Sequence, residues 1–161
     1  MTDTNKEKEF TDLLLQHQSI VYKVCLLYAQ DKEDLADLYQ ETVYNLWKSY
    51  GAFENRSSFG TWVYRIALNT CITDLRRRKH HEHVPLRLTD IDLPDDDPQD
   101  EMLNALYSLI RRLNKLDRMY IVPWLDGQTY EEIAEIVGTN RNQVAIRLHR
   151  IKEKLKTMSN L

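Results

Sequence analysis

The sequence is poor in glycine and proline, with 4 of each in 161 residues. Turn-rich β folds need more of both, whereas the residues that favour helices, such as leucine, lysine and glutamate, are plentiful. The chain also lacks an uncharged apolar run of the roughly 18 residues that a membrane span needs, and its polar start has no apolar signal-peptide core. We therefore expect a soluble, cytoplasmic, all-α protein of one larger or two small domains.

Cysteine is also scarce, because the chain has only 2, Cys25 and Cys71. Both fall at apolar positions of a helical pattern, without a second cysteine or a histidine at metal-site spacing. We predict buried, reduced thiols rather than a disulfide or a zinc framework. The run His80-His81-Glu82-His83 is the densest group of histidines, but adjacent side chains at a helix end rarely converge tetrahedrally without further ligands. We predict no metal, no cofactor and no catalytic residue.

The formal net charge of −3 hides a segregation of acidic and basic residues. Residues 90–101 hold seven acidic residues and no basic one, and without them the charge would be +4. Residues 102–161 hold ten basic residues against six acidic ones. Residues 31–41 are mainly acidic and residues 65–79 mainly basic. Two oppositely charged faces indicate two different partners, although the helix dipole alone also favours acids at helix starts and bases at helix ends.

The stretch from about His80 to Asp100 contains three of the four prolines and the acidic cluster, without a sustained apolar period. We interpret residues 81–100 as a flexible acidic linker between two small helical domains, at 1–80 and 101–161. No internal repeat is visible, so a solenoid is not expected.

Apolar spacing predicts three helices in the first domain, over about residues 10–28, 34–50 and 63–75. The third helix ends in a basic run, from Arg76 to Lys79. The polar stretch between the second and third helices contains one isolated aromatic residue, Phe53, which we place at the tip of a loop.

Trp62, Tyr64 and Arg65 lie close together at the start of the third helix. Since not all of these neighbours can face inward, at least one aromatic ring is expected at the surface beside a cation. Such a pair is typical of surfaces that stack single-stranded nucleic acid, although aromatic residues at helical spacing commonly belong to a core.

The second domain contains a helix pair with explicit start and stop signals. Thr129 and Glu132 have the spacing of a capping box, and Gly138 is suited to end the short helix that follows. Asn140 can cap the next helix. The expected inward stripe of that helix is Val144, Leu148, Ile151 and Leu155. The arrangement is that of a helix-turn-helix.

The remaining face of this last helix is polar and basic, and consists of Arg141, Asn142, Gln143, Ile146, Arg147, His149 and Arg150. Arginine can grip phosphates or read guanine, and asparagine or glutamine can read adenine in the major groove. The alternative is a plain helix pair with a solvated basic face. The capping box, the glycine turn and the basic face agree in register, which favours DNA binding.

Several short segments of the chain match sequence motifs that occur together, and in this order, in one known protein family. In the first domain they are Asp34–Val43 (DLADLYQETV) followed by Trp47, Phe59–Thr70 (FGTWVYRIALNT) and Asp74–Arg78 (DLRRR). In the second domain they are Leu113–Leu116 (LNKL), Gly127–Ala134 (GQTYEEIA) and Arg147–Arg150 (RLHR). Taken together, they resemble regions 2 and 4 of bacterial extracytoplasmic-function (ECF) sigma factors.

The resemblance implies two functions for the first domain. One is docking on the clamp helices of the large subunit of the RNA polymerase core, through Asp34, Asp37, Gln40, Glu41, Tyr44 and Trp47. The other is recognition and melting of the minus-ten element. For this function the matching residues are Phe53, Glu54 and Asn55 in the loop that receives a flipped base, Asn69 as a base reader, Trp62 and Tyr64 beside the melted strand, and Arg65, Arg76, Arg77 and Arg78 along the DNA backbone.

The resemblance also implies that the polar face of the last helix reads the minus-thirty-five element as duplex DNA. The chain would then be a promoter-specificity subunit rather than an enzyme, with an anti-sigma factor as a further partner. Capture of melted DNA needs no catalytic residue, because base extrusion costs a few kcal/mol and each stacked base returns about 1 to 3 kcal/mol. The acidic linker would thread toward the RNA path. We further hypothesise that the free linker weakens stray DNA binding, the alternative being a solvated tether.

Two features depart from the family pattern. Gln143-Val144-Ala145 stands where many relatives have Thr-Val-Lys, so the promoter sequence cannot be copied from them. Pro123 interrupts a stretch that is helical in the family, and we expect a kink or a break there.

Three other functions are compatible with parts of the sequence. A free-standing helix-turn-helix regulator would leave the Asp37-Gln40-Glu41 patch and the Phe53 loop without a purpose. A two-metal nuclease needs carboxylates that converge in a basic cleft, whereas the acids here lie on a surface helix or in the linker. A structural interaction module would not need the basic face.

Overall fold

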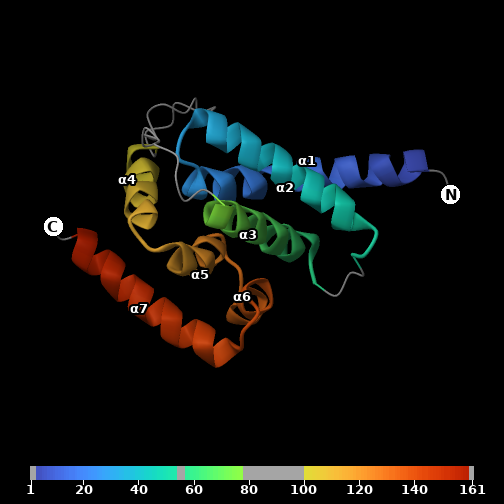
Figure 1. The fold of residues 1–161 in the computed structure, drawn as a ribbon. Helices are drawn as coiled ribbons and strands as arrows, with labels where there is room; N and C mark the ends of the chain where they lie inside the picture. Colours follow the sequence, from blue (N-terminus) through green and yellow to red (C-terminus); the bar gives the residue numbers. More distant parts are fainter. Residues whose placement is uncertain (1–2, 54–56, 78–99, 160–161) are drawn as a thin grey trace.

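The computed structural model describes residues 3–53, 57–77 and 100–159, and every regular element in these ranges is an α-helix. The predicted all-α fold is therefore confirmed. The helices are α1 (Asp3–Tyr28), α2 (Lys32–Tyr50), α3 (Phe59–Arg77), α4 (Asp100–Arg111), α5 (Lys115–Leu125), α6 (Tyr130–Val137) and α7 (Arg141–Ser159) (Figure 1). The histidine cluster and nearly all of the acidic linker lie outside the described residues.

Helices α1, α2 and α3 pack on one another and form the first half of the molecule. Helix α2 begins after Asp31, whose side chain accepts the backbone N–H of Asp34 at 2.7 Å. The three predicted helices are confirmed, and each begins earlier than its apolar pattern. Their shared core includes Val21, Val24, Leu38, Leu46, Val63 and Ala67.

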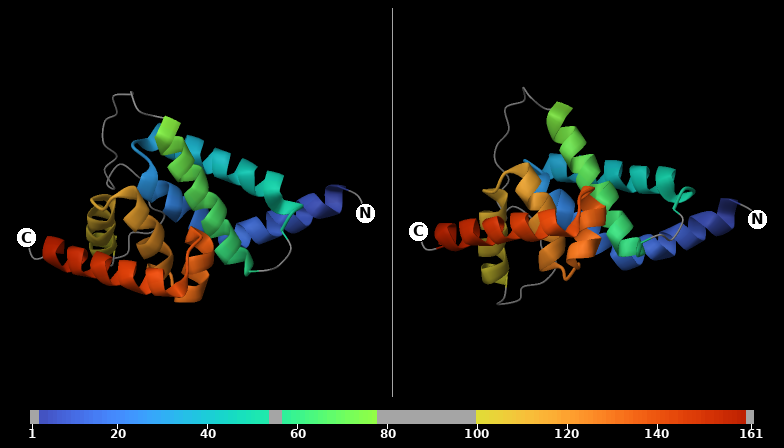
Figure 2. Two further views of the ribbon diagram at one scale, coloured as in Figure 1. Left: turned by 60° about the horizontal axis from the view of Figure 1, so that its bottom comes forward. Right: turned by 90° about the horizontal axis from the view of Figure 1, so that it is seen from below.

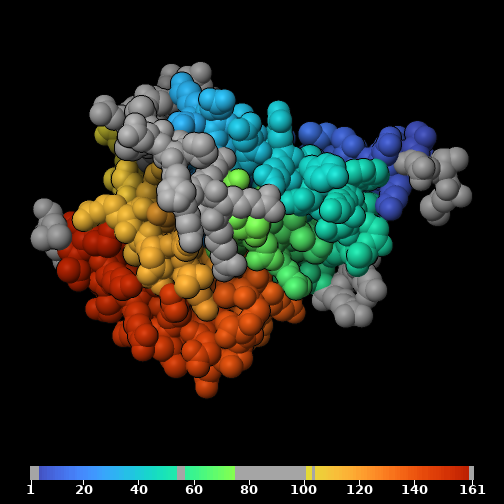
Figure 3. All heavy atoms as spheres, in the orientation of Figure 1, coloured from blue at the N-terminus to red at the C-terminus, as the bar shows by residue number. Residues whose placement is uncertain are grey.

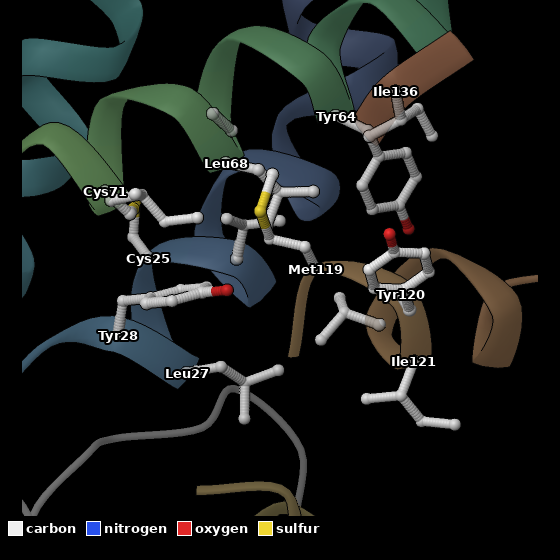
Figure 4. Close-up of a cluster of buried hydrophobic side chains, with 14 of the residues drawn as sticks. Cys25, Leu27, Tyr28, Tyr64, Leu68, Cys71, Met119, Tyr120, Ile121 and Ile136 are labelled. Atoms are coloured by element: carbon white, nitrogen blue, oxygen red, sulfur yellow. The ribbon is translucent and has the colours of Figure 1, made fainter. Parts of the chain in front are cut away.

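Both cysteines are free thiols and fully buried, as predicted. Cys25 on α1 and Cys71 on α3 lie beside each other in the core (Figure 4). The Cys25 Sγ also lies 3.6 Å from the Thr42 hydroxyl. Contact with Cys25 and burial raise the pKa of the Cys71 thiol, so this thiol stays protonated at neutral pH.

Helix α5 contains Pro123 but is not broken by it. The helix begins after Asn114, whose side chain accepts the N–H of Asp117 at 2.8 Å. It continues past the proline to Leu125, and then the backbone N–H groups of Asp126 and Gln128 donate to the Pro123 carbonyl at 3.1 and 3.0 Å. The proline therefore lies in the last turn, where its cost to the helix is small.

Every cap predicted for the helix-turn-helix is confirmed. The Thr129 hydroxyl accepts the N–H of Glu132 at 3.1 Å, and the Glu132 carboxylate accepts the N–H of Thr129 at 2.9 Å. Gly138 ends α6 with a φ of 85°, a left-handed conformation that favours glycine. The Asn140 side chain accepts the N–H of Gln143 at 2.9 Å at the start of α7. In the predicted inward stripe, Val144, Leu148 and Ile151 are buried and Leu155 is partly buried.

The second half, α4 to α7, packs directly on the first half. Helix α3 contacts α5 and α6, and α1 contacts α4 and α5 (Figures 1 and 2). In the space-filling view, atoms of α6 lie against those of α3 (Figure 3). Sequence reasoning predicted two linked domains but not this contact. Within the described ranges, every helix is too short or too polar to serve as a membrane span.

Candidate functional site

One exposed face of α2 gathers four of the six residues predicted to dock on another protein. Asp37, Gln40, Glu41 and Tyr44 are all exposed and follow the i, i+3, i+4, i+7 spacing of one helix face. The Tyr44 side chain is 62% exposed, which is unusual for so large a ring. The face therefore combines two carboxylates, an amide and an accessible aromatic ring.

The structure places the other two predicted docking residues differently. Asp34 is only 4% exposed, and its carboxylate accepts the backbone N–H of Gln30 at 2.8 Å, so it stabilises the α1–α2 turn. Trp47 is partly buried, with its ring 5.2 Å from that of Phe10 and the Lys6 ammonium 5.9 Å from its centroid. Trp47 therefore lies at the edge of the exposed α2 face, and Asp34 is buried below that face.

Phe53 is part of an aromatic cluster. It is the last described residue before positions 54–56 of the loop between α2 and α3. Its ring centroid lies 4.9 Å from that of Trp62 and 5.8 Å from that of Phe59. Tyr50 joins the same cluster, 6.4 Å from Trp62. All four rings are only partly buried, so the cluster is accessible to a stacking partner. Sequence reasoning predicted Phe53 and Trp62 but missed Tyr50 and Phe59, although both flank the loop.

On α3, Arg65 and Asn69 are exposed one turn apart and share a face. Asn69 borders a polar groove between α2 and α3 that also includes Asn45 and Thr73. The Asn45 side chain donates to the Thr70 hydroxyl at 3.0 Å and so joins the two helices beneath the groove. Glu41 and Lys48 also line this groove, so it offers charged as well as neutral hydrogen-bonding groups beside the exposed Arg65.

Tyr64 does not lie on this face. The residue is 0% exposed, and its hydroxyl donates to the carboxylate of Asp126 in the other half of the molecule. It is therefore not available to DNA in this conformation. Five further residues of the predicted minus-ten set have side chains outside the described part: Glu54, Asn55, Arg76, Arg77 and Arg78.

Helix α7 exposes most of the predicted DNA-reading face. The exposed members are Arg141, Asn142, Gln143, Ile146, His149 and Arg150. The Arg141 guanidinium already pairs with Glu131 at 2.7 Å, but both side chains are largely exposed and such a pair exchanges readily with a phosphate. These six residues leave the outer face of α7 accessible to solvent.

Arg147 is the exception on α7, because it binds the protein itself. Its Nε donates to the Asp117 carboxylate at 2.9 Å, and Lys154 donates to the other oxygen at 2.9 Å. The Arg147 guanidinium also lies 5.4 Å from the Tyr120 ring centroid. Burial opposes ionisation of Asp117, but the hydrogen bonds from Lys154 and Arg147 lower its pKa overall. Sequence reasoning missed Asp117, which fixes α7 on α5.

Within the described residues, no group of three or more histidine, cysteine or acidic side chains is placed to hold a metal ion.

Comparison with known proteins gives matches to both halves of the chain. The family models described as Sigma-70 region 2 and Sigma-70, region 4 match residues 13–81 and 103–155. The chain is similar to the ECF RNA polymerase sigma-E factor of Haemophilus influenzae, with 28% identity over 165 residues that cover 93% of this chain and 87% of that protein. It is also similar to RNA polymerase sigma factor SigV of Bacillus subtilis, with 28% identity over 157 residues that cover 90% of each.

Solved structures share the fold at lower identity. The sigma factor RpoE of Bartonella quintana, in complex with the anti-sigma factor NepR, has a TM-score of 0.72 at 19% identity, over 96% of this chain and 98% of that one. CnrH, in complex with the cytosolic domain of CnrY, has a TM-score of 0.70 at 20% identity, over 96% and 89% of the two chains.

Proposed function

The chain belongs to the ECF sigma factors, which direct RNA polymerase to promoters, and we propose that it does so through three surfaces of its own. These are the exposed face of α2, the aromatic cluster with the outer face of α3, and the outer face of α7. The observation that carries the proposal is that all three are solvent-accessible and chemically distinct.

The α2 face is the docking surface for the polymerase core. Asp37 and Glu41 supply charge that steers a basic partner, and Tyr44 supplies apolar area that is already exposed. In this proposal the partner is the pair of clamp helices of the large subunit. Asp34 contributes indirectly, by holding the start of α2.

The aromatic cluster and α3 capture the melted minus-ten strand. A base that leaves the duplex can stack on Phe53 or Trp62. Asn69 then offers hydrogen bonds to the base, and Arg65 pairs with the phosphate backbone of the DNA strand. Stacking and hydrogen bonding repay the cost of unpairing, so no reaction step and no catalytic residue is required. The protein is accordingly proposed to act by binding alone.

The α7 face reads the minus-thirty-five element as duplex DNA. Asn142 and Gln143 lie in the first turn of the helix, where recognition helices make base contacts, and Arg150 extends the basic face. Arg147 is assigned to the α5–α7 contact instead of to DNA.

Two further parts of the proposal concern a protein partner and the cellular location. The related folds of RpoE and CnrH were solved with NepR and CnrY, which supports an anti-sigma partner for this chain as well. The helices found too short or too polar to span a membrane are consistent with action in the cytoplasm. A free-standing helix-turn-helix regulator is not favoured, because region 2 is also present.

The docking surface is tested by co-elution with bacterial polymerase core in size-exclusion chromatography. Asp37→Arg combined with Gln40→Ala should abolish co-elution, because a cation would face a basic partner, while circular dichroism stays unchanged. Asp12→Arg on α1, an exposed acid with the same change of charge, is the matched control and should co-elute. Normal core binding by the α2 variant would overturn the docking assignment.

A further inference from the structure

Tyr50, the last residue of α2, connects α1 to the aromatic cluster. Its ring centroid lies 6.4 Å from that of Trp62 and 6.5 Å from that of Phe59. It also lies 5.2 Å from the ring centroid of Phe10, on the first half of α1, which runs beside the end of α2 (Figure 2). Trp62 in turn contacts Phe53 at 4.9 Å, so one continuous set of rings leads from α1 to the loop.

The first half of α1 holds Tyr50 by its ring and by its hydroxyl. Phe10 is only 5% exposed and packs against the rings of Tyr50 and Trp47, each at 5.2 Å. Burial and a hydrogen bond with the Glu9 carboxylate raise the pKa of Tyr50 to about 12, so the hydroxyl is protonated at neutral pH and donates to Glu9. Two adjacent residues of α1 therefore fix both the plane of the Tyr50 ring and its direction.

A second contact from α1 reaches the aromatic cluster at Phe59. The His17 ring lies 4.9 Å from the Phe59 ring in an edge-on arrangement, with an angle of 61° between the two planes. The His17 Nδ1 lies 2.8 Å from the Leu13 carbonyl oxygen, a contact that fixes the orientation of this ring. His17 is two turns after Phe10, so both residues face the same side of α1. We call Glu9, Phe10 and His17 the α1 support.

The rings that receive a base need such support, because stacking depends on the angle between the two planes. A base stacks on the face of a ring, whereas aromatic side chains commonly pack on one another in tilted or edge-on contacts. The planes of Phe53 and Trp62 are 38° apart, and both rings are only partly buried. A smaller side chain at position 50 would leave Trp62 room to rotate, and the binding of a base would then carry the cost of ordering this ring.

We propose that Tyr50 is a positioning residue for base capture: held by the α1 support, it keeps Phe53 and Trp62 in the orientation that receives an unpaired base. The inference rests on the proposed function, because it deepens the capture of the melted minus-ten strand. It also gives α1 a part in promoter opening. Tyr50 acts through the rings of Phe53 and Trp62 and does not itself contact the base.

Ring positioning is measurable in the free protein by time-resolved fluorescence anisotropy of Trp62. The other two tryptophans, Trp47 and Trp124, are replaced by phenylalanine, which keeps a ring at both positions. In this background Tyr50→Leu should increase the amplitude of the sub-nanosecond decay at least about twofold, because Trp62 gains rotational freedom. Tyr39→Leu, the same change about three turns earlier on α2 at another partly buried residue, is the matched control and should leave the amplitude unchanged. Equal amplitudes for the two variants would overturn the positioning role.

The consequence for promoter opening is tested in the complex with polymerase by a double-mutant cycle. The probe is a genomic DNA fragment with a start site mapped for the wild-type protein, and permanganate reactivity of thymines measures opening. Tyr50→Leu alone should reduce opening about fivefold, but only up to about twofold further when Phe53 is already alanine, because one of the rings that it positions is then absent. Tyr50→Phe keeps the ring at position 50 and should retain most of the opening.

The outcomes distinguish the inference from the proposed function. The same fold reduction by Tyr50→Leu in both backgrounds would show that Tyr50 acts by a contact of its own, and would overturn the positioning role. Equal losses for Tyr50→Phe and Tyr50→Leu would overturn the assignment to the ring, and loss of co-elution with polymerase core would place Tyr50 in docking instead. Normal opening by Phe53→Ala would count against the proposed capture, while the anisotropy of Trp62 would still test whether Tyr50 positions this ring.

Discussion

The two helices that expose DNA-binding residues, α3 and α7, are held in place in different ways. Helix α7 is positioned from within its own half, by the Asn140 cap and by the Asp117 carboxylate. Helix α3 packs on α1 and α2 of its own half and is also held by the other half, through Thr61 and Tyr64. The comparison teaches that a local cap such as Asn140 can be read from sequence, whereas anchors that lie far away in the chain, such as Asp117 for α7 and Asp126 for α3, cannot.

The largest stability effect is expected where α7 is anchored. Asp117→Ala leaves Arg147 and Lys154 without their shared acceptor and should lower the free energy of unfolding by about 2 to 3 kcal/mol, the worth of a buried hydrogen bond to a charged group. Urea unfolding measures this loss. Glu135→Ala removes an exposed carboxylate from α6 and serves as the control. Similar small losses in both variants would mean that α7 is not anchored by Asp117.

On α3, the expected effect concerns function rather than folding. Phe53→Ala removes one stacking ring and should weaken capture of the melted strand by about 1 to 2 kcal/mol, which reduces promoter opening about tenfold. Permanganate reactivity of thymines near the start site measures opening, and core binding should be unchanged. Asn69→Ala should act in the same direction. If the variants reduced only the formation of the complex with unmelted promoter DNA, the result would contradict the capture role.

The local signals at α6 predict a smaller change. Thr129→Ala removes the acceptor for the N–H of Glu132 and should cost about 1 kcal/mol of stability, a typical value for a helix N-cap. Thr157→Ala, within α7, is the matched control, because its hydroxyl only donates to the Glu153 carbonyl of its own helix. Equal stability of the two variants would argue that the capping box is dispensable.

A fall in pH should weaken the anchoring of α7 by Asp117 and that of α3 by Asp126, with little effect near neutral pH. The pKa values of Asp117 and Asp126 are lowered in the folded protein, so each contributes stability above its ordinary pKa of about 4 and loses it as the pH falls through the lowered value. Thermal melts between about pH 7 and 2 should therefore show a steep loss below about pH 4. Asp117→Asn should flatten this loss, and an unchanged profile would exclude Asp117 as a contributor.

The helix-turn-helix was predictable from sequence because its signals are local. Thr129, Glu132, Gly138 and Asn140 lie within a dozen residues, and each one has the predicted role. The three helices of the first half were predictable for the same reason, since apolar spacing marks the buried side of each.

The remaining features depend on contacts between residues far apart in the chain. Aspartate is common on protein surfaces and tyrosine is common in DNA contacts. Here, however, Asp34 supports the α1–α2 turn, and the Tyr64 hydroxyl donates to Asp126. The contact of Cys25 with Cys71 and the binding of Arg111 to the end of α1 likewise require the tertiary arrangement. No spacing rule in a single sequence reports such pairs.

The account is tested most directly by transcription in vitro from genomic DNA of the bacterium that encodes the chain. Polymerase core alone and core with the purified protein are compared by mapping the 5′ ends of the transcripts. The account predicts new, discrete start sites with the protein, preceded by two common sequence blocks, and their loss with the Asp37→Arg and Gln40→Ala variant. The same start sites with and without the protein, despite stoichiometric core binding, would contradict it.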